Sequence, residues 1–374
     1  MKKLLIIHPA LAPYMVDQFN ALSRLYHLEV VFLFKNLWYD KFDQSKLLPL
    51  LKFKTSFLLR GPESKERVFR FNMLRTIRQI KPDIIIGYEY SYTTQYLLLL
   101  KSLGILHQEI GSIVDDNIEI CHHVQSKIRY IARQLAVKRL DYLIVLSKDV
   151  SEFYQQRFGF NENQIVVSPI LQDPNRLRSN KIELEKLASE YAQQHTLYGK
   201  KVLLYVGRFA HVKALPRFIH TVSELLHKQK DVVLVLVGDG DEKLQIRKMI
   251  TELHLEDKII LPGRFEGDEL YAWYLCASGL VLPSTYEPFG AVVNEAMIFG
   301  AKVLCSKYAG STVLVGSDTG LTFDPLNEKD TLGKLELFLE DMEILTDVSL
   351  ERRPSLMLSH EHNFRNEWNK IYKV

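Results

Sequence analysis

Short apolar runs alternate along the chain with segments whose apolar residues recur at helical spacing. In the first half, segments such as 15–26 and 128–140 have the helical pattern. The apolar runs lie at 3–9, 28–34, 82–89, 108–114, 141–147 and 163–170. Continuous apolar strands that alternate with amphipathic helices are typical of a parallel sheet whose two faces are both covered. The first half therefore predicts an α/β domain.

A polar stretch at 171–200 interrupts this alternation, and its charged helical pattern without a strong core face predicts a linker and an entry helix. Five further apolar runs lie at 201–208, 232–240, 257–263, 279–285 and 301–307. The predicted fold is α/β, with two doubly wound, Rossmann-like domains at 1–170 and 171–355 facing each other across a cleft. A C-terminal helix at about 356–374 is expected to pack back on the first domain. Ligands of such sheets bind beyond the carboxyl ends of the strands, here in the cleft.

Composition places the chain among ordinary globular proteins. It has 374 residues, of which 47% are hydrophobic and 25% charged, so two domains are expected. Cys121, Cys276 and Cys305 are odd in number and far apart, which predicts reduced, packed thiols in a cytoplasmic protein. The apolar start of the chain is too short and too interrupted for a signal peptide. No apolar run approaches the roughly 20 residues that a membrane-spanning helix needs.

Positive charge is concentrated in one segment, although the net charge is only +3. Lys41–Lys81 contains eleven Lys and Arg residues against three Asp and Glu residues, interleaved with leucine and phenylalanine. This mixture suits an anionic membrane surface and predicts a protein held peripherally at the inner face of the membrane. The alternative is a helix pair with a solvated basic face, because Pro49 interrupts any long amphipathic helix. No nucleic-acid-binding motif is present, so nucleic acid is not an expected partner.

Candidate chemistry begins directly after the first apolar run of the second half. Gly207 and Arg208 follow that run, and Lys213 comes five residues later. A glycine at the start of a helix lets backbone N–H groups approach an anion, and the helix dipole favours negative charge there. Arg208 and Lys213 add fixed positive charge. The arrangement predicts a diphosphate site.

Two glutamates flank a second turn of this kind, at the end of the run at 279–285. Glu287 precedes Pro288-Phe289-Gly290, and Glu295 lies about one turn into a helix predicted to start near Gly290. A carboxylate beside a diphosphate is costly unless it accepts hydrogen bonds, which sugar hydroxyls donate. We therefore expect one acid at each end of a nucleotide sugar, with the helix start around Phe289–Ala291 holding the diphosphate between them.

These segments resemble the retaining glycosyltransferases of family 4, which have the GT-B fold and an E-x7-E signature. Glu287 and Glu295 have the signature spacing. "GRFAHVKAL" is similar to the family's phosphate motif, and "LVGDGDEKLQIRKMI", which contains Gly238, is similar to its G-x-G-x3-L segment. The long stretch from "DELYAWYLCASG" to the Ala309-Gly310-Ser311 loop also matches the family pattern. The resemblance covers about Lys201 to Pro325.

The resemblance implies a donor site and a reaction. Donor-binding residues would be Gly207, Arg208, Lys213, Gly238, Glu287, Phe289, Gly290, Ala291 and Glu295, with Arg264 and Phe265 against the nucleobase. Arg208, Lys213 and the helix start would take the place of a divalent metal ion, so neither metal nor cofactor is expected. The implied reaction is transfer of a sugar from a UDP- or GDP-sugar to a sugar or lipid-linked acceptor, with retention of anomeric configuration.

The first half resembles the family only in architecture. Many members carry a His-Asp pair after a later strand of this half, and the matching segment here reads "SIVDDN". Asp115 stands where the histidine would be, and Asp116 keeps the acid. Both are candidate catalytic residues, and Asp115 could either polarise the acceptor hydroxyl or hydrogen-bond the donor sugar. The expected role is polysaccharide, lipopolysaccharide or glycolipid assembly; a nucleotide-sugar epimerase and a non-catalytic nucleotide-sugar-binding protein are the alternatives.

Overall fold

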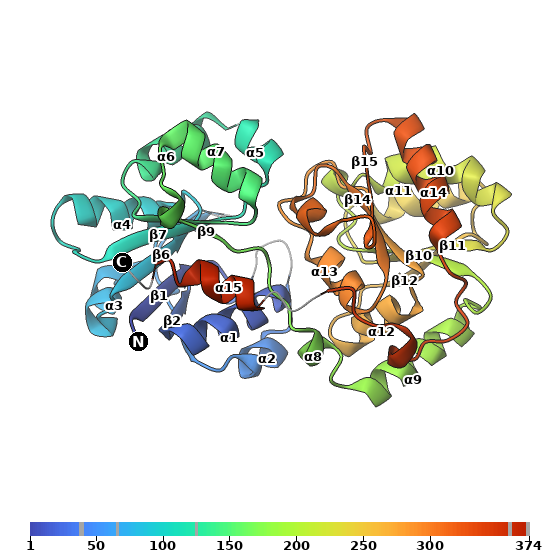
Figure 1. Ribbon diagram of the computed structural model, residues 1–374, viewed down its shortest axis with the longest axis horizontal. Coiled ribbons are helices and arrows are strands. Elements are labelled where there is room, and N and C mark those ends of the chain that lie inside the picture. Colours follow the sequence, from blue (N-terminus) through green and yellow to red (C-terminus); the bar gives the residue numbers. More distant parts are fainter. Residues whose placement is uncertain (37–40, 65–66, 124–125, 358–360, 372–374) are drawn as a thin grey trace. The chain divides into compact units, whose positions relative to one another are not determined.

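The chain forms two compact units, each built on its own parallel sheet. The computed structural model describes residues 1–36, 41–64, 67–123, 126–357 and 361–371. Unit 1 comprises Met1–Gln172 together with His360–Val374, and unit 2 comprises Asp173–Ser359 (Figure 1). The predicted pair of α/β domains with parallel sheets is confirmed.

Unit 1 contains a seven-stranded sheet in the order β3-β2-β1-β6-β7-β8-β9, with every neighbouring pair parallel. Its strands are β1 (Lys3–His8), β2 (His27–Phe32), β3 (Lys54–Phe57), β6 (Ile84–Tyr88), β7 (Glu109–Val114), β8 (Tyr142–Val145) and β9 (Ile165–Val167). A separate antiparallel ribbon pairs β4 (Glu63–Ser64) with β5 (Arg67–Val68). The strand order reverses between β1 and β6, and the carboxyl ends of strands at such a reversal are where ligands bind in this class of sheet.

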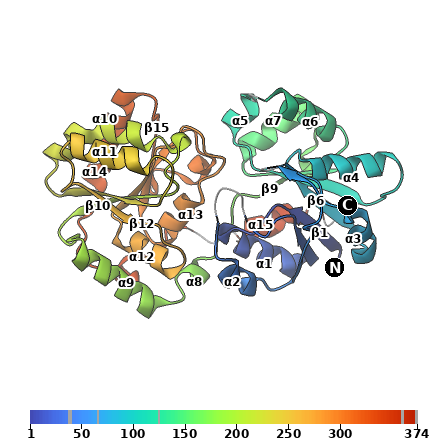
Figure 2. The same ribbon diagram turned by 180° about the vertical axis from the view of Figure 1, so that it is seen from behind.

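Helices cover both faces of the unit 1 sheet, because alternate residues of its buried strands point to opposite faces. Leu4 and Ile6 pack with α1 and α15, whereas Leu5 and Ile7 lie in the core that α3, α4, α6 and α7 share. Figure 2 shows the same separation from behind, with α1 and α4 on opposite sides of the strands. The helices are α1 (Val16–Leu25), α2 (Gln44–Leu47), α3 (Met73–Ile80), α4 (Tyr92–Ser102), α5 (Ile118–His122), α6 (Lys127–Val137), α7 (Lys148–Phe158) and α15 (Glu361–Trp368).

The last helix of the chain returns to unit 1. α15 packs against β9 and α1. The Tyr26 hydroxyl donates to the Trp368 carbonyl at 2.6 Å, and the Val167 N–H donates to the Glu367 carboxylate at 2.8 Å. Trp368 is fully buried in the core of this face, so the C-terminal segment completes the packing of a sheet formed by residues far earlier in the chain.

Unit 2 contains a six-stranded parallel sheet in the order β12-β11-β10-β13-β14-β15. Its strands are β10 (Lys201–Val206), β11 (Val232–Val237), β12 (Ile259–Gly263), β13 (Gly279–Leu282), β14 (Lys302–Ser306) and β15 (Gly320–Phe323). Its helices are α8 (Pro174–Leu177), α9 (Lys181–Gln194), α10 (Leu215–Lys228), α11 (Lys243–Glu252), α12 (Asp268–Cys276), α13 (Ala291–Ile298) and α14 (Glu328–Asp341). The order reverses between β10 and β13, so the loops after these two strands start side by side.

Three features differ from the pattern-based expectations. β3 and β15 were not predicted; both are short edge strands, and the "KTSF" of β3 is exposed and polar, so no apolar run marks it. The expectation that α9 lacks a core face is wrong, because Leu184, Ala188 and Ala192 are fully buried and α9 packs on α12. Two of these three side chains are alanines, which add little to an apolar periodicity.

Two further expectations concern thiols and membrane spans. The three cysteines are free and buried, as predicted. Among the described residues, no helix combines the length and the apolar character needed to cross a bilayer.

Candidate functional site

The loops after β10 and β11 form the floor of a candidate site in unit 2. The Gly207 N–H donates to the Val237 carbonyl at 3.0 Å, and the Phe209 N–H donates to the Asp239 carbonyl at 2.8 Å. Gly238 has a φ of 156°, and a Cβ atom there would lie 1.9 Å from the Gly207 carbonyl oxygen. Only glycine permits this close approach, so the two predicted glycines hold neighbouring strand ends together.

The start of α13 lies over the next strand of the sheet. Gly290 caps the helix with a φ of 94°, and a Cβ atom would meet a Leu282 methyl group at 2.8 Å and the Ser311 hydroxyl at 3.1 Å. Ala291 is the first helical residue and Phe289 is buried. The helix starts next to Gly290, as the sequence predicted. The N–H groups of a helix's first turn can bind an anion.

Lys213 and Glu287 form an ion pair between the two loops. Lys213 ends a short 3-10 turn, η4 (His211–Lys213), and its ammonium binds the Glu287 carboxylate. The Thr285 N–H donates to the Val212 carbonyl at 2.8 Å, which ties the β13 loop to η4. The Lys213 and Glu287 side chains are only 18% and 12% exposed. A cation and a carboxylate are therefore held together at the reversal point of the sheet.

Glu295 occupies a different environment on the inner side of α13. Its carboxylate accepts a 2.7 Å hydrogen bond from the Tyr274 hydroxyl of α12. Burial, and then the charge of Glu295, raise the pKa of Tyr274 well above its usual value, so the phenol remains a donor. Sequence reasoning did not identify Tyr274; its position in an apolar helical pattern gave no sign that its hydroxyl meets Glu295.

The remaining predicted donor residues are Arg208, in the loop after β10, and Arg264 and Phe265, after β12. Arg208 is exposed at the end of β10. Arg264 follows β12, two strands away from β10 in the sheet, and pairs with Glu266 at 2.7 Å. Phe265 packs its ring against Tyr191 and Trp273, with centroids 5.7 and 5.9 Å away. The structure thus brings Gly207, Lys213, Glu287 and Gly290 together and leaves Arg264 and Phe265 at one side.

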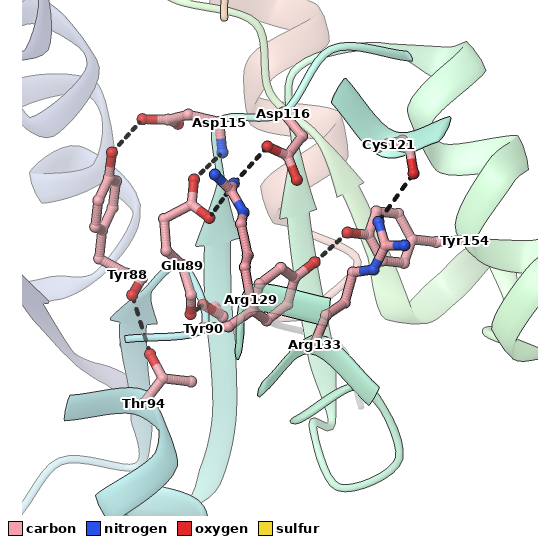
Figure 3. Close-up of polar contacts among 11 residues, drawn as sticks. Tyr88, Glu89, Tyr90, Thr94, Asp115, Asp116, Cys121, Arg129, Arg133 and Tyr154 are labelled. Carbon is pink, nitrogen blue, oxygen red and sulfur yellow. Dashed lines mark hydrogen bonds and ion pairs between the residues drawn. The ribbon is translucent and has the colours of Figure 1, made fainter. Parts of the chain in front are cut away.

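Unit 1 has its own cluster of polar side chains at the carboxyl ends of β6 and β7 (Figure 3). Asp115 and Asp116 follow β7, and the Tyr88 hydroxyl donates to the Asp115 carboxylate at 2.9 Å. Arg129 of α6 binds Asp116 at 2.5 Å. Asp116 is almost fully buried, whereas Asp115 is partly exposed. The two neighbouring acids are therefore held by different partners, and Asp115 is the more accessible one.

Glu89 is a third acid of this cluster and was missed by sequence reasoning. It follows β6 in a left-handed conformation, with a φ of 52°. Its carboxylate accepts from the Asp115 N–H at 3.1 Å and from Arg129 at 2.9 Å. The available signal was its position at the carboxyl end of an apolar run, but only the adjacency of β6 and β7 shows that it meets Asp115.

The cluster holds more carboxyl groups than its contacting cation can balance. Removal from water raises the pKa of Asp115 to about 6; the Tyr88 hydrogen bond lowers it and the charge of Asp116 raises it. Burial likewise raises the pKa of Glu89, and Asp116 adds to that shift. Glu89, Asp115 and Asp116 thus form a carboxyl cluster that takes up protons more readily than isolated acids do. In the described part of the chain, no three His, Cys, Asp or Glu side chains are arranged to hold a metal ion.

Comparison with known sequences finds a family model that matches most of unit 2. Residues 188–351 match the family model described as "Glycosyl transferases group 1". The chain is 26% identical to the 2-deoxystreptamine glucosyltransferase of Streptomyces kanamyceticus over 196 residues, 52% of this chain and 50% of that protein. It is 22% identical to the uncharacterized glycosyltransferase YqgM of Bacillus subtilis, over 78% and 77% of the two chains. The match spans about half the length, or less, of the first curated relatives.

Solved structures share the fold of the whole chain. Anabaena Alr3699/HepE, solved in complex with UDP, has a TM-score of 0.72 at 18% identity, with all of both chains covered. The lipopolysaccharide outer core galactosyltransferase WaaB, in its apo form, has a TM-score of 0.64 at 19% identity, with 99% of each chain covered. The GT-B fold expected from the sequence, with two parallel-sheet α/β domains, is thereby confirmed.

Proposed function

We propose that this chain is a retaining glycosyltransferase of family 4 that moves a sugar from a nucleotide-diphosphate donor to an acceptor hydroxyl. The observation that carries the proposal is the mostly buried Lys213–Glu287 pair beside the glycine-capped start of α13. A cation, a helix N-terminus and a carboxylate at one strand reversal suit a ligand that has both phosphates and hydroxyls. The same residues lie within the stretch that matches the glycosyltransferase family model.

In the proposed reaction, the bond between the anomeric carbon and the diphosphate oxygen breaks while the acceptor oxygen bonds to that carbon. Negative charge develops on the leaving diphosphate. Arg208, Lys213 and the first N–H groups of α13 stabilise it, so no divalent ion is required. The acceptor attacks from the face that the diphosphate leaves, and its proton passes to a leaving phosphate oxygen. Configuration at the anomeric carbon is then retained.

The two glutamates serve opposite ends of the donor. Glu295 accepts hydrogen bonds from vicinal hydroxyls of the nucleotide, and its bond from Tyr274 fixes the carboxylate for this role. Glu287, held by Lys213, accepts from a hydroxyl of the transferred sugar. Gly207 and Gly238 let the backbone approach the donor. Arg264 and Phe265 are assigned to the nucleobase.

The carboxyl cluster of unit 1 is assigned to the acceptor. Asp115 accepts a hydrogen bond from the attacking hydroxyl and so increases its nucleophilicity. Asp116, Glu89 and Arg129 fix the loop that carries Asp115, through the contacts described above. Asp115 thereby replaces the histidine that many family members carry.

The proposed donor is a UDP- or GDP-sugar, and HepE supports UDP because that protein was solved with UDP and with UDP-glucose. The proposed role is polysaccharide, lipopolysaccharide or glycolipid assembly by a cytoplasmic protein at the inner face of the membrane. WaaB, named as a lipopolysaccharide galactosyltransferase, supports a role of this kind.

A panel of UDP-, GDP- and ADP-sugars tests the proposal. The matching donor should raise the thermal midpoint, because a ligand that binds the native state stabilises it. With that donor, NMR should detect release of the nucleoside diphosphate and, on an acceptor, an anomeric signal of the donor's own configuration. An inverted product would refute retention, and binding without release would favour a non-catalytic protein. Release of a rearranged sugar without transfer would favour an epimerase.

A further inference from the structure

Three helices on one side of the unit 1 sheet carry no acidic residue. α3, α4 and α6 together contain six Lys and Arg residues and no Asp or Glu. All three contribute to the same core beneath them. Their outward surface is called here the α3–α4–α6 face. Exposed helices of a soluble protein usually carry charges of both signs, so this face is chemically unusual.

The outward side of α6 is apolar. Ile128, Ile131 and Leu135 are 62%, 57% and 47% exposed. Their spacing of three and four residues places them on one side of the helix. Ala136 and Val137 supply the buried side. α6 therefore presents a row of large aliphatic side chains to the outside, although its inner side already has an apolar core to pack on.

Two more exposed leucines lie on the neighbouring helix α4 and directly after its end. Leu99 and Leu103 are 55% and 62% exposed. α4 and α6 pack side by side, and the Gln95 amide donates to the Ala132 carbonyl at 2.9 Å. Figure 1 shows α4 and α6 as neighbours on the same side of the unit. Exposed apolar residues shared by adjacent helices form a patch, which marks an interaction site more often than scattered apolar residues do.

Cations border this patch. Lys127 lies at one end of α6, and Lys138 and Arg139 follow its other end; all three are exposed. On the α3 side, a hollow of about 590 Å³ is lined in part by Arg75, Arg78 and the aromatic rings around them. Phe69 contacts Tyr96 of α4 across it, with ring centroids 5.2 Å apart. Arginines in a shallow hollow offer a place for a phosphate group.

We propose that the α3–α4–α6 face lies on an anionic membrane surface. Aliphatic side chains ringed by cations match such a surface, because acyl contact and headgroup attraction add. A second copy of the chain would bring like charges together, which disfavours self-association through this face. The inference deepens the membrane part of the proposed function and rests on that part alone, not on the transfer chemistry.

The location differs from the one that the sequence suggested first. Leucine and phenylalanine at the start of the basic segment were expected to enter the membrane, but most of them pack inward. Leu47, Leu48, Leu51 and Phe53 pack against the α1 core. Only part of the apolar content of that segment, such as Leu50, is exposed. Phe57, Leu59 and Phe71 of that segment are exposed as well, but these side chains come from separate elements and form no row on one helix.

Vesicle co-sedimentation of the full chain tests the proposal. Vesicles of phosphatidylglycerol and phosphatidylcholine should bind the protein at low salt, whereas pure phosphatidylcholine should bind it poorly. Replacing Lys127, Lys138 and Arg139 with glutamine should lower the partition coefficient on the order of a hundredfold, at about fivefold per cation. The matched control replaces Lys46, Lys52 and Lys54, three exposed cations of the first-suggested segment, and should lose much less.

The apolar contribution is tested with Ile128, Ile131 and Leu135 changed together to serine. Binding to anionic vesicles should fall at least about tenfold, while circular dichroism and the thermal midpoint stay close to wild type because these side chains are already exposed. Absence of wild-type binding at low salt, or an equal loss in the control variant, would overturn the proposal. A wild-type dimer that the serine variant converts to monomer in light scattering would also overturn it, in favour of self-association. Nucleotide-induced thermal shifts, measured without vesicles, report on the donor site separately.

Discussion

Replacing Lys213 with alanine should destabilise unit 2 and weaken nucleotide binding at once. The change removes the Lys213 ammonium from the Glu287 carboxylate, whose side chain is only 12% exposed. The Ser284 hydroxyl also donates to the Glu287 carboxylate, in a long bond of 3.4 Å. Breaking a buried ion pair by removing one partner costs about 3–5 kcal/mol, and an exposed pair contributes about 0–1 kcal/mol.

Since both side chains are mostly buried, we expect a loss of about 3 kcal/mol for Lys213→Ala. For a unit of this size that lowers the melting temperature by about 6–12 °C. Glu287→Ala should cost less, because the flexible lysine stem can carry its ammonium to water. The double variant should lose less unfolding free energy than the sum of the two single losses, because the carboxylate that lacks the Lys213 ammonium is then absent.

Urea unfolding and calorimetry of the four proteins measure this cycle, and Arg264→Ala is the matched control. Arg264 pairs with Glu266 in the same unit at 2.7 Å, but its side chain is 41% exposed, so its loss should cost under about 1 kcal/mol. Nucleoside diphosphate should bind about 10–100-fold more weakly to Lys213→Ala and no more weakly to Glu287→Ala, whose lysine is released. The reasoning would be refuted if Lys213→Ala had the same melting temperature as Arg264→Ala. It would also be refuted if the unfolding free energies lost in the two single variants added up to the loss in the double variant.

Three further predictions concern the other proposed residues. Glu295→Ala should weaken both free nucleoside diphosphate and donor in calorimetric titrations, whereas Glu287→Ala should lower transfer and spare the nucleotide; the reverse would show the two ends assigned backwards. Transfer should persist in EDTA, and a loss that Mg²⁺ restores would contradict the metal-free chemistry. Asp115→Asn should slow transfer. It should also raise the unfolding free energy at pH 8 by about 1–3 kcal/mol. The reason is that the pKa of Asp115 is raised in the folded state, so ionising this group costs the folded state more than the unfolded one. That gain should shrink as the pH falls through 6 towards 4 in urea titrations, and a gain independent of pH would exclude a titrating Asp115 as its cause.

Much of the fold could be predicted because its signals are local. Buried parallel strands are continuous apolar runs, and the structure has strands at the predicted runs of both halves. The edge strands β3 and β15 were not predicted, because an edge strand needs no continuous apolar run. Glu295 could be placed on a helix because Gly290 marks the start of α13 and the chain between them is short.

Contacts between distant residues were decided by the order of strands and helices in space. Lys213 and Glu287 are 74 residues apart in the sequence. They form a pair because β10 lies beside β13 in the sheet. Glu89 meets Asp115 only because β6 pairs with β7, and Arg129 reaches Glu89 and Asp116 from a helix further along the chain. The α3–α4–α6 face requires three helices to pack on one side of a sheet. Composition and periodicity indicate whether each segment is buried or exposed. Packing across the whole domain decides which segments become neighbours, and these sites form between such neighbours.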